Sequence, residues 1–297
     1  MKRWEKWLES AFPILLILPV LALFTVTNLY PVLYAIILSF QRRTPWDLVG
    51  QWVGLHNYDI VLNDPEFWAS VTRGFVFGFG SVAVQILAGL FTALVVRQRF
   101  RGKPIIVTLV LVPYIVPTFA TALIMRWIFN DMYGVANYVL FSLGFVESYA
   151  SFFGNISRAM PTLILANSWQ YAMFVTLIFL ARMMTINPNL YEMAEVMGAS
   201  AFRKFRDITL PSIKGVFLLV ILLRSIWMFN KFDVIYLLTH GGPLSSTTTL
   251  PILTYQKAFE GQQFGIGAAI ATLTFVILAV FAITYFVLLK PEKEIAT

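Results

Sequence analysis

One apolar segment of this chain carries a row of side chains that can bind a polar solute. Arg224, Trp227, Met228 and Lys231 follow the spacing i, i+3, i+4, i+7, which predicts that they share one face of a helix. A cation within an apolar span costs ~2.5–3.5 kcal/mol, so it usually faces protein or a water-filled cavity. We therefore expect this face and the neighbouring Asn230 to line a solute pathway. The alternative is that Arg224 bonds backbone carbonyls and that Trp227 is a core residue.

A second polar cluster, Asn-Ser-Trp-Gln-Tyr from Asn167 to Tyr171, interrupts another apolar segment. Its Asn167, Trp169 and Gln170 offer two amides and an indole N–H, all of which can hydrogen-bond a solute. The same groups would also suit a polar clamp between subunits. Both interpretations stay open at the level of the sequence.

A charged and regularly patterned segment, EMAEVMGASAFRKFRDITLP from Glu192 to Pro211, separates two apolar segments. Gly198 suits a sharp turn between two helices, and Ser200 can cap the second of them. We predict an amphipathic helix pair over residues 187–211, which the final Leu-Pro ends before the next apolar segment. Such a pair either anchors to lipid headgroups or presents a face to a cytosolic partner.

No residue of the chain is predicted to be catalytic or to bind a metal. The sequence contains no cysteine, and its two histidines, His56 and His240, lie far apart in polar loops. A nucleotide-binding loop needs the pattern G-x-x-x-x-G-K-[ST]. The single Gly-Lys pair is followed by Pro104, and Arg97 stands where the first Gly belongs. We therefore expect no enzyme activity and no cofactor on this chain.

The composition indicates a protein whose main solvent is lipid. Hydrophobic residues make up 59% of the 297 residues and charged residues 12%, about half of the usual charged share of a soluble domain. A membrane-spanning helix needs about 20 predominantly apolar residues. We therefore predict an all-α polytopic membrane protein with six transmembrane helices. The six spans are expected over residues 12–40, 75–96, 105–129, 161–181, 216–238 and 266–289.

Lys and Arg gather at both chain ends, after the second predicted span and around residues 187–211. Because cytoplasmic flanks carry the excess of these residues, we predict that both termini and the helix pair lie in the cytoplasm. Residues 1–11 and 291–297 are the expected cytoplasmic ends of a transmembrane domain over residues 12–290. The net charge of +7 is explained by flanks that face anionic lipid, with no need for nucleic acid.

The helix pair resembles the cytoplasmic coupling loop of permease subunits from binding-protein-dependent ABC importers. That loop has the pattern E-A-A, three residues, Gly, nine residues and I-x-L-P, and the matching residues here are Glu192, Ala194, Gly198, Ile208, Leu210 and Pro211. Met193 replaces the middle Ala, and Met197 stands where Asp is common. The resemblance implies that this loop docks into a cleft of an ATPase subunit through Glu192, Ala194, Glu195, Gly198, Ala199 and Phe205.

Two further stretches resemble the maltose-type carbohydrate branch of this family. FNKFDVIYLLTHGGPLSSTTT begins at Phe229 and has the branch's aromatic-Asn-x-aromatic-Asp pattern before LLT-x-GGP. GLHNY begins at Gly54 and is similar to the branch's first outer loop, G-L-x-N-Y. The resemblance covers residues 28–289. It implies that the loop of Gly241, Gly242 and Pro243 contacts an extracytoplasmic binding protein.

The resemblance also implies the other subunits of the transporter. This chain would be a multi-pass subunit of the bacterial inner membrane that pairs with a second, homologous permease. ATP-binding subunits in the cytoplasm would hold ATP and Mg²⁺, and a solute-binding protein would deliver a sugar or sugar derivative for transport by alternating access. Two cations on the pathway face suggest a solute with an acidic group. The alternative is a neutral sugar, which arginine can also bind through its N–H groups.

Two other function classes fit a polytopic membrane protein. An ion-coupled secondary transporter needs acidic residues within its spans, and Asp233, near the end of the fifth predicted span, comes closest. A membrane scaffold that only anchors partners has no aqueous pathway and gives Arg224 and Trp227 no role. Solute uptake by vesicles that hold this chain alone would favour the secondary transporter.

Overall fold

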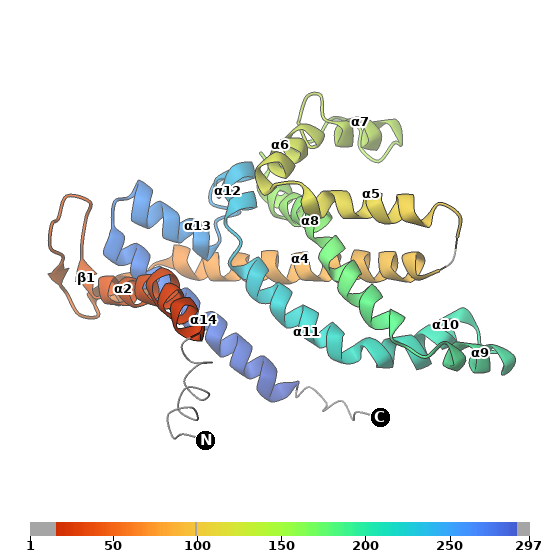
Figure 1. Ribbon diagram of the computed structural model, residues 1–297. Helices are drawn as coiled ribbons and strands as arrows, with labels where there is room; N and C mark the ends of the chain where they lie inside the picture. Colours follow the sequence, from red (N-terminus) through yellow and green to blue (C-terminus); the bar gives the residue numbers. More distant parts are fainter. Residues whose placement is uncertain (1–15, 99, 290–297) are drawn as a thin grey trace, which may run out of the picture. The chain divides into compact units, whose positions relative to one another are not determined.

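The computed structural model describes residues 16–98 and 100–289, and most of them are helical (Figure 1). Five of the described helices are long and apolar enough to cross a membrane, and a bent pair of helices would make a sixth span. These findings confirm the predicted all-α, polytopic fold. The expected cytoplasmic ends, residues 1–11 and 291–297, lie outside the described residues, as do residues 12–15 and 290.

The chain divides into two compact units. The first unit comprises Met1–Phe67 and Leu253–Val276, and the second comprises Trp68–Ile252 and Ile277–Thr297. Three helices, α4 (Pro65–Arg97), α13 (Leu250–Tyr255) and α14 (Phe264–Leu288), run across the division.

A single apolar helix, Leu16–Ser39, opens the described part of the first unit, and none of its most apolar window is buried within the structure. It contains a π-helical turn, η1 (Thr25–Leu29), followed by α2 (Tyr30–Ser39) with Pro31 in the first turn. The exposed apolar side chains of this helix are those of a span that faces lipid or another membrane subunit.

The remaining elements of the first unit are short. A two-stranded antiparallel hairpin follows α2, with Gln41 of the first strand opposite Trp52 of the second. The bounds of these elements are β1 (Gln41–Arg42), β2 (Gln51–Trp52), α3 (His56–Leu62) and η3 (Gln256–Glu260).

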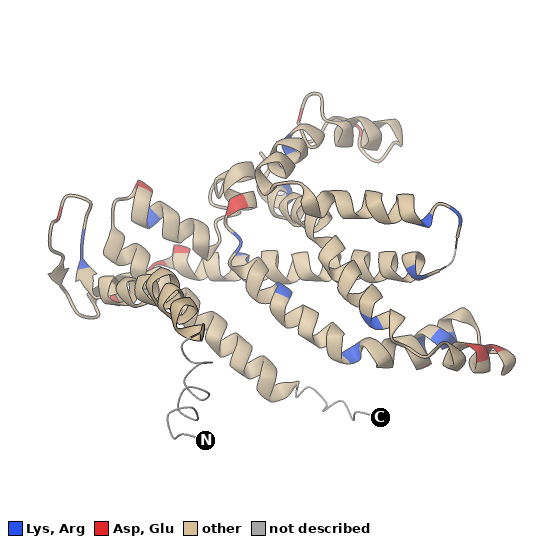
Figure 2. Ribbon diagram, viewed as in Figure 1, with Lys and Arg blue, Asp and Glu red and all other residues tan. Residues whose placement is uncertain are grey.

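The second unit is a bundle of long and short helices (Figure 1). Figure 2 shows few charged residues along the middle of its long helices and several where α9 and α10 lie. Besides α4, its elements are α5 (Lys103–Ile115), α6 (Thr118–Ile128), α7 (Val135–Ser142), α8 (Ile156–Met184), α9 (Pro188–Val196), α10 (Ala201–Lys204), η2 (Phe205–Thr209), α11 (Leu210–Phe229) and α12 (Asp233–Thr239).

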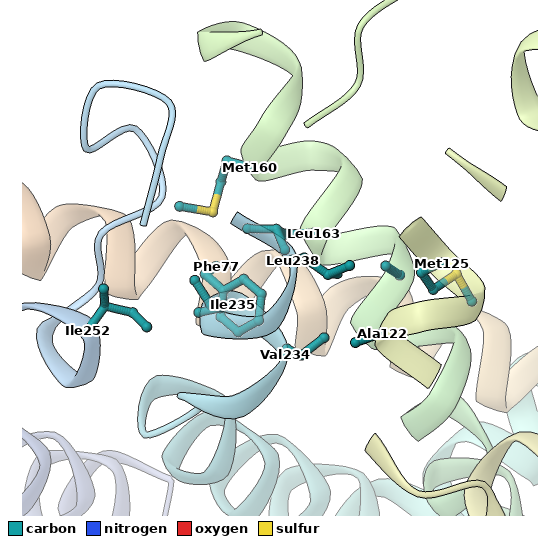
Figure 3. Packing of buried hydrophobic residues seen from close by; sticks show 10 residues of the cluster. Phe77, Ala122, Met125, Met160, Leu163, Val234, Ile235, Leu238 and Ile252 are labelled. Atoms are coloured by element: carbon teal, nitrogen blue, oxygen red, sulfur yellow. The ribbon is translucent and has the colours of Figure 1, made fainter. Parts of the chain in front are cut away.

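Two apolar clusters form the core of the second unit. In the first, shown in Figure 3, Phe77 of α4 and Leu163 of α8 meet Ile235 of α12. In the second, α4, α8 and α11 pack together through residues such as Phe179 and Ile213, both fully buried. Together these contacts pack α4 against α8 and α11, the two helices that carry most of the residues predicted to line a pathway.

The third predicted span, residues 105–129, is divided into two helices. It consists of α5 and α6, which are bent by 102° relative to each other. Pro117 lacks an N–H and disfavours a helical conformation at the residue before it. Val116 accordingly is extended, with ψ of 127°. The break therefore has a local cause in the sequence.

The fifth predicted span, residues 216–238, differs from the structure at both ends. A continuous helix runs from Ala201 to Phe229, and α12 is a separate helix after it. The predicted stop at Leu210-Pro211 is also wrong, because the π-helical turn η2 lets the N–H of Leu210 bond to the carbonyl of Phe205. Pro211 therefore lies inside the continuous helix, directly after the π-helical turn.

The other spans keep their predicted places with shifted ends. The second, expected over residues 75–96, begins earlier because Pro65 opens α4 and the carboxylate of Asp64 accepts the N–H of Glu66. The fourth and sixth, expected over residues 161–181 and 266–289, correspond to α8 and α14. The first, expected over residues 12–40, is the helix Leu16–Ser39.

Candidate solute pathway and coupling segment

Arg224 lies inside the second unit, where α4, α8 and α11 meet. It is 2% exposed, and its Nε donates to Oε1 of Gln85 on α4 at 2.8 Å. Within the described part of the chain, no carboxylate pairs with the guanidinium. Arg224 is therefore a buried cation held by a neutral amide and not, as the alternative had it, by backbone carbonyls.

The thioether of Met228 is the centre of this polar core. Its Sδ accepts N–H groups from Asn167 at 3.0 Å, from Gln85 at 3.4 Å and from Arg224 at 3.6 Å. These donors come from three helices, so Met228 connects the three helices inside the bundle and does not line a pathway. A thioether is a weak acceptor, which makes this an unusual way to satisfy three buried donors.

An aromatic layer covers the buried guanidinium. The Cζ atom of Arg224 lies 4.9 Å from the ring centroid of Tyr171 and 5.5 Å from that of Trp227. Phe174, on α8, stands 5.3 Å from the indole of Trp227. Trp227 itself is 47% exposed, so it offers an open aromatic face backed by a cation. Such cation–π contacts are favourable when they are desolvated.

Lys231 approaches the same tyrosine from the loop that follows α11. Its Nζ donates to the hydroxyl of Tyr171 at 2.6 Å and pairs with the carboxylate of Asp233 at 2.9 Å. The helix ends at Phe229, so Lys231 is not on the predicted helical face, yet the loop still brings it beside Arg224 through Tyr171. Asn230 is exposed, and its Nδ2 donates back to the carbonyl of Ile226.

The break between α5 and α6 lies next to this cluster. Gln170 of α8 donates its Nε2 to the carbonyl of Val116 at 2.8 Å, which satisfies a backbone group that the break frees from helical pairing. Tyr114 of α5 stands edge-on to Tyr171 with ring centroids 6.5 Å apart. Non-helical backbone at membrane depth is tolerated where it is buried in protein or lines a cavity.

The structure divides the Asn-Ser-Trp-Gln-Tyr cluster between two places. Asn167 and Gln170 are buried and belong to the polar core and to the break. Trp169 instead lines a separate, largely apolar hollow between α4, α5 and α8 together with Pro113 and Leu165. It therefore does not join the residues around Tyr171.

Sequence analysis missed two central residues of this arrangement. Gln85 and Tyr171 were not among the predicted site residues, although the first supports Arg224 and the second contacts both cations. An amide within the apolar α4 was a usable signal, because polar residues in spans seek partners on other helices. The position of Tyr171 between two cations depends on contacts more than 50 residues apart in sequence.

The predicted helix pair is present as α9 and α10. The side chain of Asn187 caps α9 and that of Ser200 caps α10. Gly198 joins them with φ of +75°, in the left-handed region that glycine tolerates best. Lys204 reaches back to Glu195 at 3.6 Å, so the two short helices are held as one unit.

The outer side of this helix pair is apolar as well as charged. Val196 is 90% exposed and Met197 81% exposed, and Met193, Phe202 and Glu192 are exposed around them. Ala194, Ala199 and Phe205 are half-buried against the chain itself. Exposed apolar patches of this kind mark protein interaction sites. The predicted contact residues therefore surround a larger apolar patch that sequence analysis did not include.

The helix pair is joined to the spans by polar contacts. The guanidinium of Arg97, at the end of α4, lies 4.2 Å from the ring centroid of Tyr191. The hydroxyl of Tyr191 is 2.9 Å from that of Thr209. Tyr191 of α9 therefore contacts both α4 and the π-helical turn that continues into α11.

The Gly241-Gly242-Pro243 loop is a folded turn. Gly241 is buried with φ of +90°, and its carbonyl accepts the N–H of Thr247 and the hydroxyl of Thr248. The peptide between Gly242 and Pro243 is cis. Leu244, which was not predicted, is the strongly exposed side chain at this turn. In the described part of the chain, no group of His, Cys, Asp and Glu could hold a metal ion.

The chain matches proteins of known type. The family described as binding-protein-dependent transport system inner membrane component matches residues 85–291. The trehalose/maltose transport system permease protein MalF of Thermococcus litoralis is 36% identical over 280 residues, which are 94% of each chain. The sulfoquinovosyl glycerol transport system permease protein SmoG of Agrobacterium fabrum is 31% identical over 277 residues, which are 92% of this chain and 89% of that relative.

The fold is also similar to that of solved structures. A chain of a bacterial ABC transporter involved in the import of the acidic polysaccharide alginate superposes with a TM-score of 0.84. The match covers 99% of this chain and 100% of that one, at 20% sequence identity. This likeness supports the arrangement of helices described above.

Proposed function

Because this chain belongs to the family of binding-protein-dependent transport system inner membrane components, we propose that it lines the path of a sugar or sugar derivative through an ATP-driven importer. The chain is a multi-pass inner-membrane subunit of a transporter and not an enzyme. We propose that both termini and the α9–α10 pair lie in the cytoplasm. Lys and Arg are concentrated in these segments of the sequence, and cytoplasmic segments carry the excess of such residues.

The observation that carries the proposal is the cluster of Tyr171, Trp227 and Lys231 beside the break between α5 and α6. The open indole face suits the apolar face of a sugar ring, and the lysine and tyrosine can exchange hydrogen bonds with hydroxyl groups. Arg224 acts from behind, as a positioning residue that fixes the aromatic layer. Broken membrane helices are typical of transporter substrate sites. The break between α5 and α6 beside this cluster agrees with that pattern.

The sugar class is supported by the relatives. The permeases that match this chain over more than nine-tenths of its length serve trehalose and maltose in one case and sulfoquinovosyl glycerol in another. An ion-coupled mechanism finds less support in the structure. Asp233, the acid nearest to the cluster, is paired with Lys231 at 2.9 Å.

We propose that the energy enters through the α9–α10 pair. Glu192, Glu195 and Gly198 would meet an ATP-binding subunit, which holds ATP and Mg²⁺, and the exposed Val196 and Met197 would fill an apolar part of the same contact. A second, homologous permease would complete the pathway. The turn of Gly241, Gly242 and Pro243 would present Leu244 to an extracytoplasmic binding protein.

The experiment is reconstitution of the complete importer in proteoliposomes, with the binding protein loaded in turn with neutral and acidic sugars. We expect ATP-dependent uptake of one sugar class, and Trp227→Ala should lower it far more than Trp169→Ala, because only Trp227 lies in the cluster. Uptake by vesicles that contain this chain alone, driven by an ion gradient, would contradict the proposal.

A further inference from the structure

A basic hollow lies in the first unit, whereas the cluster described above belongs to the second unit. It has a volume of about 320 Å³, within the range of small-molecule sites, roughly 300–1,000 Å³. Arg42, Arg43 and His56 line it, together with Thr44 and with Gly265 in the first turn of α14. All of these residues belong to one compact unit, so the hollow is formed within that unit.

The walls of the hollow are held in place by hydrogen bonds. Arg43 donates its Nη1 to the hydroxyl of Tyr34 on α2 at 2.6 Å. The buried amide of Asn57 donates to the carbonyls of Ser39 and Gln41 at 2.8 and 2.9 Å. A Cβ on Gly265 would collide with the carbonyl of Gln41 at 1.9 Å. The hairpin and the start of α14 therefore approach as closely as a glycine allows.

The charge of the hollow favours an anion. Two arginines and the N-terminal end of a 25-residue helix favour negative charge at this place, although the first amide of that helix, at Phe264, already donates to the carbonyl of Arg43. Asp47 is the acidic residue of the same hairpin, although it is not among the residues that line the hollow. The pKa of Asp47 lies below its usual value, chiefly because the backbone N–H of Thr44 donates to the carboxylate, with the Thr44 hydroxyl adding a second bond. The bonds from Thr44 hold the carboxylate of Asp47 in the turn, and its charge also acts on Arg43, so the charge of the two arginines still exceeds that of this one carboxylate.

The tip of the same hairpin is apolar and exposed. Trp46, Leu48 and Val49 are 81%, 95% and 86% exposed, and Trp52 and Leu55 add further exposed apolar area beside them. The hairpin begins at Gln41, directly after the span Leu16–Ser39. It therefore stands at a membrane surface, the level at which tryptophan is enriched in membrane proteins.

We propose that this hollow binds the phosphate of a membrane phospholipid, while the hairpin tip enters the acyl region beside it. The two observations are independent, because one is a basic cavity and the other is an apolar tip, and a phospholipid is the ligand that carries both complementary parts. Arg42, Arg43 and His56 contact the phosphate, and Trp46, Leu48 and Val49 contact the chains. The site fastens the hairpin and the first span to one leaflet.

The depth of the tip can be measured directly, because the sequence contains no native cysteine. A nitroxide is attached to Leu48→Cys in the complete importer in nanodiscs of phosphatidylethanolamine and phosphatidylglycerol. Glu260→Cys, an exposed polar position of the same unit, is the control. We expect oxygen to relax the Leu48 label at least threefold more strongly than a water-soluble nickel complex does, and the control to show the reverse order.

The headgroup contact is tested by native mass spectrometry of the same importer. The double variant Arg42→Gln/Arg43→Gln should retain at least tenfold less phosphatidylglycerol, whereas Arg158→Gln, at an exposed arginine of the second unit, should retain as much as the unaltered chain. Excess inorganic phosphate should not displace the lipid, because it lacks the acyl chains.

Three results would overturn the assignment. One is a water-exposed Leu48 label in the nanodisc. Another is lipid retention that the double variant leaves unchanged. The third is a Leu48 label that becomes protected only when the binding protein is added, which would make that protein the occupant.

Discussion

Replacing Gly198 by valine tests whether α9 and α10 form the coupling site. Gly198 has φ of +75°, and a Cβ placed on it meets nothing within 4 Å in this chain. Valine therefore makes no clash inside the subunit. The left-handed conformation costs valine about 1–2 kcal/mol, which lowers the ratio of the native turn to other conformations by a factor of roughly 5–30.

We expect Gly198→Val to abolish transport and the solute-stimulated part of ATP hydrolysis, while the protein still inserts into the membrane. Two effects combine: the turn is less often formed, and an isopropyl group stands where the partner's backbone approaches. Gly198→Asn separates them, because asparagine tolerates the left-handed conformation but still adds bulk. If bulk dominates, the asparagine variant also fails, and if turn geometry dominates, it retains activity.

The matched control is Gly144→Val. Gly144 has φ of +74° and also has nothing within 4 Å of its Cβ position, but it follows α7 and is far in sequence from the coupling segment. The Gly144→Val substitution introduces the same backbone strain outside the coupling segment, so transport should stay near the normal rate. The assay is ATP hydrolysis and uptake by the reconstituted importer, with and without loaded binding protein. Normal transport by Gly198→Val would refute the coupling assignment.

Substitutions at three further positions address the pathway. Gln85→Leu removes the acceptor of Arg224 and should lower the free energy of unfolding by ~1.5–3 kcal/mol. Gln85→Glu keeps an acceptor, so this variant should unfold near the normal temperature. Thermal unfolding in detergent measures both effects. Trp227→Ala should raise the solute concentration for half-maximal uptake, and Trp227→Phe should restore part of it. Lys231→Ala should weaken uptake of an acidic sugar at least tenfold if the solute is anionic; unchanged uptake of a neutral oligosaccharide would remove the basis for an anionic solute.

The parts of the structure with local causes could be predicted from the sequence. The caps at Asn187 and Ser200 and the left-handed Gly198 are set by the residues that occupy those positions, so the helix pair was recognisable. The apolar spans were recognisable for the same reason. The break at Val116-Pro117 also has a local cause, and the predicted span over residues 105–129 gave the apolar run more weight than the proline.

The parts that depend on distant contacts could not be predicted. Gln85 and Arg224 are 139 residues apart, and no periodicity within either helix indicates that they meet. Helical spacing correctly placed Arg224 and Met228 together, but it did not show that both face the interior of the subunit. Lys231 was assigned to the same face, and its place beside Tyr171 results instead from the loop after Phe229.

The choice of acceptor in the polar core bears on how the subunit moves. If α9 transmits a displacement from an ATP-binding subunit, α11 must shift against α4 and α8, and the bonds between these helices must change. A carboxylate opposite Arg224 would oppose such a shift, because breaking a buried ion pair by separating the partners leaves uncompensated charge. The thioether of Met228 is a weak acceptor that three donors share, and the stronger acceptor of Arg224 is the neutral amide of Gln85, so these bonds oppose the shift less than a buried ion pair would. A core of this kind keeps a cation behind the aromatic layer and still allows the helices around it to slide.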